Sequence, residues 1–98
     1  MKSVIINNKP INLKPIDFGA ICELEELGFN VTSVTKKTFS SIRCAVAFQM
    51  EIGVDEAGAE IENHIKNGGS IADFLPFLEI ITESDFFQNL VQSIGKKN

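Results

Sequence analysis

The sequence contains neither tryptophan nor tyrosine, although eight of its 98 residues are phenylalanine. Phenylalanine adds apolar area without a polar group, so it suits a protein core or a dry contact between proteins. No apolar run approaches the roughly 20 residues that a membrane-spanning helix needs, and the opening MKSVIINNKP lacks the apolar stretch of a secretory signal. From these absences we expect a cytoplasmic protein that binds no membrane.

Side chains suited to catalysis or metal binding are also few. There is one histidine, His64, and the metal-binding patterns CxxC, HxxxH and HExxH do not occur. We interpret His64 as a half-buried residue near the C-terminus of a helix, and Cys22 and Cys44 as reduced thiols in apolar helical surroundings. A cysteine–histidine enzyme stays open as a third hypothesis, but neither cysteine lies in the basic setting that activates a thiol. We expect no enzymatic activity, no cofactor and no metal.

Charge is divided unevenly along the chain. Residues 1–50 hold six Lys/Arg and four Asp/Glu, a balance of +2, whereas residues 51–98 hold three Lys and nine Asp/Glu, a balance of −6. An acidic half repels phosphate, so we expect no nucleic-acid partner and favour a basic or apolar protein partner. The basic patch formed by Lys36, Lys37 and Arg43 keeps one alternative open, a small helix-turn-helix-like DNA-binding regulator that reads DNA with helices around Lys36–Met50.

The length predicts a single domain over residues 1–98. Its first part, residues 3–16, reads SVIINNKPINLKPI, in which β-branched residues, a turn at Asn7-Asn8 and an alternating segment predict a β-hairpin. Pro10 and Pro15 lack amide donors and keep the second strand short or at an edge. A lone hairpin is marginal in water, so this one has to pack on helices or on another chain.

Residues 17–94 are predicted to form four to five short helices packed as a compact bundle, so the fold class is mainly α with a small β part. Asp17 caps the first helix, which Gly28 ends, and a connector over 29–37 has a turn near 32–34. The second helix, Lys37 to Glu51, is apolar on nearly all sides and is expected to be central, with Gly53 stopping it. A third helix is expected over Asp55–Asn67 and is ended by Gly68-Gly69. A fourth starts at Ser70 and is broken after Leu75 by Pro76. A fifth is capped by Ser84, and a frayed tail follows over 95–98.

Apolar side chains concentrate in the last two predicted helices. Two interpretations are open: the residues form this domain's own core, or part of them is left exposed as a binding face. The candidates are Phe74, Phe77, Phe86, Phe87, Leu90, Val91 and Ile94.

The chain resembles the small tail assembly chaperones of long, non-contractile-tailed (siphovirus-type) phages and prophages of Gram-positive bacteria. The stretches KSVIINNKPINLK, FGAICELEELGFNV and IENHIKNGGSIADFLPFLEIITESDFFQNL carry this resemblance, which covers most of the chain. It implies a non-enzymatic protein that binds the tape measure protein and/or the tail tube protein during tail assembly, self-associates, works in the bacterial host cytoplasm and is absent from the mature virion. A long, apolar and helical partner of that kind is bound by laying apolar helix faces together, so the seven candidates above are our predicted partner-binding residues.

Overall fold

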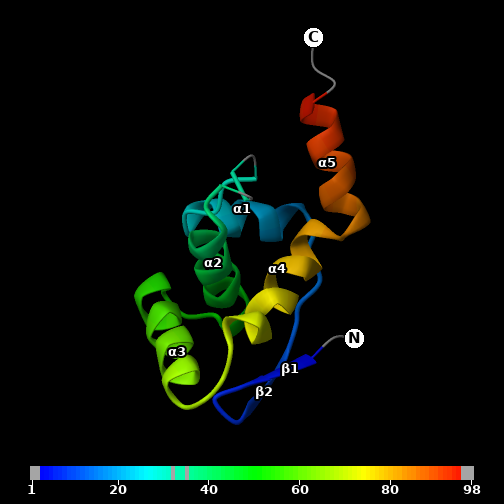
Figure 1. Cartoon of the computed structure of the whole chain (residues 1–98). Coiled ribbons are helices and arrows are strands. Elements are labelled where there is room, and N and C mark those ends of the chain that lie inside the picture. The colour runs from blue at the N-terminus through cyan, green and yellow to red at the C-terminus, as the bar shows by residue number, and fades with distance from the viewer. Residues whose placement is uncertain (1–2, 32, 35, 96–98) are drawn as a thin grey trace.

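A two-stranded antiparallel hairpin, five α-helices and one 3₁₀ helix make up the computed structural model, which describes residues 3–31, 33–34 and 36–95 (Figure 1). This confirms the predicted fold class, mainly α with a small β part. The elements in chain order are β1 (Ser3–Ile6), β2 (Lys9–Asn12), α1 (Phe18–Glu26), α2 (Thr38–Met50), α3 (Val54–Lys66), the 3₁₀ helix η1 (Ile71–Phe74), α4 (Leu75–Thr82) and α5 (Asp85–Gly95).

The hairpin closes through a two-residue turn. Asn7 and Asn8 both have positive φ, 53° and 63°, which is the backbone that a tight hairpin turn needs and that asparagine tolerates. Ile6 pairs with Lys9 beside the turn, and Ile5 pairs with Pro10 one step further out. Since bonded and non-bonded pairs alternate along an antiparallel ladder, Pro10 falls in a non-bonded pair and its missing N–H breaks no bond of the ladder.

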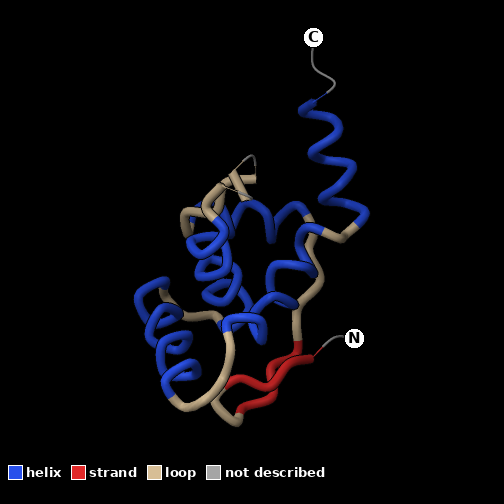
Figure 2. The backbone as a smooth tube through the Cα atoms, in the orientation of Figure 1, coloured by secondary structure: helices blue, strands red, loops and turns tan. Residues whose placement is uncertain are grey.

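Helix α2 is the centre of the fold, as its all-round apolar sequence predicted. Helices α1, α3 and α4 and strand β2 all pack against it (Figures 1 and 2). Burying a helix on so many sides requires small residues as well as large ones, because neighbouring backbones have to approach closely. Its buried residues accordingly include small and large side chains: Ser41, Ile42, Cys44, Ala45, Val46, Ala47, Phe48 and Gln49.

The end of α2 differs from the prediction, in which Gly53 stops the helix. The chain leaves the helix at Glu51, which takes the left-handed conformation with φ 59°. Gly53 instead caps the start of α3, and its N–H donates to Glu56 Oε1 at 3.4 Å. The prediction failed because it assigned the left-handed cap to the nearest glycine, whereas Glu51 adopts that backbone and its carboxylate pairs with Lys14 (3.2 Å).

Of the other predicted boundaries, some are confirmed and some shift: the hairpin expected over 3–16 ends at Asn12, the break expected after Leu75 falls before it, and Gly95, expected in the tail, ends α5. Asp17 caps α1 by accepting from the N–H of Ala20 at 2.8 Å, and Gly28 ends that helix with φ 109°. Pro76 occupies the first turn of α4, so the chain changes from the 3₁₀ helix η1 to α4 at Leu75. Part of the predicted connector turn, at residue 32, and residues 96–98 of the predicted tail lie outside the described residues.

A buried glutamine fixes the chain where it leaves the hairpin. Gln49 of α2 donates from Nε2 to the Lys14 carbonyl at 3.0 Å and accepts from the Lys14 N–H through Oε1. One amide therefore satisfies both backbone groups of Lys14, as a paired strand would. The Lys14 ammonium lies 4.3 Å from the centre of the Phe48 ring, which adds a cation–π contact at the same place.

Helix α5 extends away from the rest of the molecule. It packs mainly on α4, and its C-terminal half projects beyond the bundle (Figures 1 and 2). The projection gives the molecule an elongated outline of 48 × 27 × 20 Å. This placement leaves part of the α5 surface without cover from its own chain, and that surface carries the candidate residues Val91 and Ile94.

Candidate functional site

The structure divides the seven predicted partner-binding residues into two groups. Three are buried in this chain's own core: Phe74, Phe77 and Phe87. Four are partly or largely accessible: Phe86 (37% exposed), Val91 (38%), Ile94 (48%) and the half-buried Leu90. The core interpretation therefore applies to the first group, since a buried ring cannot touch a partner without rearrangement, and the partner-binding interpretation remains for the second.

The accessible apolar residues of α5 form one stripe. Ser84 begins the helix by accepting from the Phe87 N–H at 3.1 Å, and Asp85 adds a favourable charge in the first turn. Spacings of three and four residues then place Phe87, Leu90, Val91 and Ile94 on one face. Phe87 anchors this face in the core, whereas the following residues run out along the projecting part of the helix. We call Leu90, Val91 and Ile94 the distal stripe.

An exposed aromatic pair lies next to the start of α5. The rings of Phe18 and Phe86 meet edge to face, with centroids 6.3 Å apart, and Phe18 is 62% exposed. Cys22, which we expected in apolar surroundings, is exposed like Phe18 on the same helix, and Ile21 and Leu24 are buried instead. A nine-residue helix that starts at Phe18 has a narrow buried face, and spacing alone did not show where that face is centred.

A groove lies where the segment before α1 passes the junction of α4 and α5. Its apolar lining comes from Pro15, Ile16, Ile80 and Phe86, and its acidic rim from Glu79, Glu83 and Asp85. The cavity volume is about 530 Å³, within the range of ordinary binding pockets. We call this site the α4–α5 groove. Sequence reasoning missed it, because nothing local in the sequence shows that residues 15 and 16 lie beside residues 79–86.

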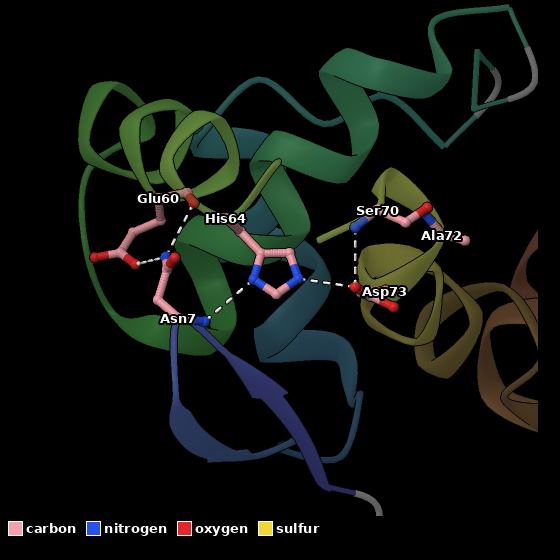
Figure 3. Close-up of polar contacts among 6 residues, drawn as sticks. All are labelled: Asn7, Glu60, His64, Ser70, Ala72 and Asp73. Carbon is pink, nitrogen blue, oxygen red and sulfur yellow. Dashed lines mark hydrogen bonds and ion pairs between the residues drawn. The ribbon is translucent and has the colours of Figure 1, made fainter. Parts of the chain in front are cut away.

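His64 occupies a junction between the hairpin, α3 and η1 (Figure 3). The backbone N–H of Asn7 donates to His64 Nδ1 at 3.2 Å, and His64 Nε2 lies 2.8 Å from Asp73 Oδ2. Because Nδ1 accepts, the proton of the neutral imidazole is on Nε2 and points at the carboxylate. The predicted half-buried histidine is confirmed, since its side chain is 14% exposed.

Further contacts tie the hairpin turn and η1 to this junction. The Asn7 side-chain amide donates to the carbonyl and carboxylate of Glu60, at 3.0 and 2.7 Å (Figure 3). Asp73 also accepts from the Ser70 N–H at 3.1 Å, while Ser70 Oγ accepts from the Ala72 N–H, which completes the capping box predicted at Ser70. The turn of the hairpin is thus bound to α3.

A histidine bonded to an aspartate invites comparison with a catalytic pair. In such a pair, the second ring nitrogen faces a nucleophile or substrate. Here that nitrogen, Nδ1, is already taken by the backbone of Asn7, and the ring edge rests on Phe74 with centroids 5.2 Å apart. The geometry therefore describes a structural junction in which both nitrogens of His64 are occupied.

Glycine is required beside this histidine. Gly68 has φ 98°, and the N–H of Gly69 returns to the His64 carbonyl at 2.9 Å, which together form a Schellman end to α3. A Cβ atom at Gly69 would clash with the His64 ring, so any larger residue at position 69 would displace that ring. The Gly68-Gly69 pair predicted as a helix stop therefore also makes room for the imidazole.

The cysteines have different environments. Cys44 is buried and its thiol donates to the Leu27 carbonyl at 3.4 Å, while Cys22 is exposed, so our prediction of apolar surroundings is correct for Cys44 alone. Burial raises the pKa of the Cys44 thiol, and the neighbouring Arg43 charge opposes that shift. Over the described residues, no cluster of three His, Cys, Asp or Glu side chains is placed to hold a metal ion, and no helix has the length and apolarity to cross a membrane.

Comparisons of this chain with protein-family models, with curated proteins and with solved structures find no match. Its function therefore has to be inferred from its own surfaces. Two of them gather several apolar residues in the described part of the chain: the distal stripe of α5 and the α4–α5 groove, which reaches the same helix at Phe86.

Adjacent phenylalanines provide a direct test of core against surface. Phe87→Ala removes a buried ring and should cost about 3–5 kcal/mol of unfolding free energy, whereas Phe86→Ala removes a partly exposed ring and should cost about 1 kcal/mol. Urea unfolding of both variants, followed by circular dichroism, measures the difference. Equal losses would show that the two rings are buried alike and that the described placement of α5 is wrong.

The pKa of Asp73 is held below its usual value, first by the hydrogen bond with His64 and then by the Ser70 N–H. A lowered folded-state pKa contributes stability above the unfolded-state pKa of about 3.9 and loses it as pH falls through the folded value. We therefore expect Asp73→Asn to flatten the fall in stability below about pH 4. Urea unfolding at pH 3 to 7 measures this, and parallel profiles for the two proteins would contradict it.

Proposed function

We propose that this protein is a non-enzymatic tail assembly chaperone of a siphovirus-type phage or prophage of Gram-positive bacteria. It binds the tape measure protein and/or the tail tube protein while the tail assembles, works in the bacterial host cytoplasm and is absent from the mature virion. The resemblance of the sequence to such chaperones motivates this proposal. The observation that carries it is the distal stripe, an apolar helix face held away from the body of the molecule.

The shape of that face suits a helical partner. Leu90, Val91 and Ile94 follow the spacing by which one amphipathic helix anchors on another. A stripe on a projecting helix can be approached from several sides, so a long partner can lie along it without meeting the bundle. An apolar, helical tape measure protein would aggregate if left bare, and covering one of its faces in this way keeps it dispersed.

The same surface also suits self-association, which the proposal includes. A partner helix from a second copy can cover the distal stripe as a tape measure helix does, and the two modes then compete for one face. Exposed apolar area elsewhere includes Ile5 of strand β1, which is 68% exposed. The hairpin lies at the other end of the fold from the tip of α5 (Figure 1). Contacts between two different surfaces of identical chains build open or ring-shaped assemblies.

The DNA-binding alternative gains no support from the packing. A recognition helix has to present one face to the major groove. Helix α2, which carries Arg43 and follows Lys36 and Lys37, is buried on most sides by the other elements. The proposal therefore includes no nucleic-acid partner, no membrane partner, no cofactor and no catalytic step.

The distal stripe can be tested with a double variant. Val91→Ser/Ile94→Ser keeps α5 helical and removes the two most exposed apolar side chains of the stripe, so co-purification with co-expressed tape measure protein should be lost. Asn89→Ser/Gln92→Ser is the matched control, since the same substitution falls on the polar face of α5 and should leave co-purification unchanged. Circular dichroism checks the folding of each variant. Retention of the tape measure protein by the stripe variant would contradict the proposal.

A further inference from the structure

The α4–α5 groove combines an apolar lining with unpaired negative charge. The exposure of the apolar lining varies: Ile16 is largely buried, Ile80 is half-buried and Pro15 is exposed. The rim holds three carboxylates within seven residues, 79–85, and no lysine or arginine contributes to the lining. An occupant of this groove therefore meets hydrophobic contacts in its middle and negative charge at its edge.

These carboxylates have no cation to balance them among the described residues. The ion pairs formed there lie elsewhere in the fold and join Lys9 with Glu60, Lys14 with Glu51, and His64 with Asp73. Helix α4 itself supplies no compensating positive charge, because no basic residue occupies its last turn. The rim therefore keeps its negative potential in the free protein.

The helix backbone contributes partial charges of both signs here, because α4 ends and α5 begins beside the groove. Glu79 lies in the last turn of α4 and Glu83 caps its C-terminus, the end where unpaired carbonyls give a helix partial negative charge. Acidic side chains at this end destabilise a helix, whereas cations stabilise it. Asp85 lies favourably in the first turn of α5, whereas Glu79 at the end of α4 is placed unfavourably, and a cationic partner would relieve the strain on Glu79.

The main chain around the groove offers few groups for pairing with a strand. Pro15 has no N–H, and both backbone groups of Lys14 bond to Gln49. The remaining walls are the helices α4 and α5, whose backbone groups bond within the helix. An extended peptide would find few partners here, so an occupant has to bind through its side chains, as a helix does.

We propose that the α4–α5 groove binds a basic amphipathic helix, with an apolar ridge seated on Ile80 and Phe86 and flanking lysine or arginine side chains at Glu79 and Glu83. This inference rests on the proposed function and deepens it. Phe86 belongs to the groove and begins the helix that carries the distal stripe, so one helical partner can contact both surfaces. The groove selects basic segments of the partner, and the stripe selects apolar ones.

A synthetic peptide tests the groove without the natural partner. The probe is a helical peptide of leucine and lysine, about 18 residues long so that it forms a stable helix, with leucine at every third and fourth position. Fluorescence anisotropy gives its affinity, and amide chemical shifts give its location, which we expect at residues 16–18 and 79–86. Binding should weaken at high salt, because exposed charges are screened.

The variant Glu79→Gln/Glu83→Gln should weaken peptide binding by about tenfold at low salt, since two rim charges are removed. Glu25→Gln/Glu62→Gln is the matched control: it changes the net charge equally at exposed positions on α1 and α3 and should leave affinity within about twofold.

Three outcomes would overturn the inference. The control pair weakening binding as much as the rim pair would mean that net charge alone attracts the peptide. Chemical-shift changes confined to residues away from the groove would place the peptide elsewhere. The same shifts appearing when the protein is concentrated without peptide would make a second copy the occupant.

The groove and the proposed function can fail separately. Val91→Ser/Ile94→Ser should lose the tape measure protein yet bind the peptide within about twofold of the wild type, since the variant leaves the rim charges in place. If the wild type binds tape measure protein but not the peptide, the groove inference alone is wrong. If the wild type binds the peptide in the groove but does not bind tape measure protein, the proposed function is wrong and the groove remains a helix-binding site.

Discussion

The need to cover α2 on nearly every side shapes the whole molecule. A helix whose residues 44–49 are all buried requires neighbours around most of its circumference. Helices α1, α3 and α4 and strand β2 supply that cover, and each of them is short. Because these elements occupy the surface of α2, the last helix has to pack on α4 instead. Phe87 reaches the core and Leu90 packs partly against it, but Val91 and Ile94 run past its edge. The exposed stripe is thus a consequence of how the core is filled.

Two polar contacts decide where the hairpin lies against this core. Gln49 binds the backbone of Lys14 at one end, and His64 with Glu60 binds Asn7 at the turn. Polar groups buried with their partners are specific in position, because a shift of one residue leaves them unpaired. The hairpin therefore leaves the core at a fixed point, and Pro15 and Ile16 come to rest beside α4. A wall of the α4–α5 groove depends in this way on a glutamine in α2.

Local rules accounted for most of the fold. The Asn7-Asn8 turn, the caps at Asp17, Ser70 and Ser84, and the break before Pro76 all depend on a few neighbouring residues, and each was predictable from the sequence. The site was less accessible to such rules. Periodicity placed seven apolar residues on the last helices but does not distinguish a ring that enters the core, such as Phe77, from one at its margin, such as Phe86. That distinction, like the groove, depends on contacts between segments far apart in the sequence.

Native-state hydrogen exchange tests the central claim most directly, namely that α5 carries apolar surface its own chain does not cover. A helix as short as α5 is marginal by itself and needs packing for protection. In dilute protein, the amides of residues 90–94 should therefore exchange orders of magnitude faster than those of residues 44–49 in α2, and a bound helical partner should slow them. Equal protection of the two segments in the free, monomeric protein would show that the stripe is already covered and would contradict the account.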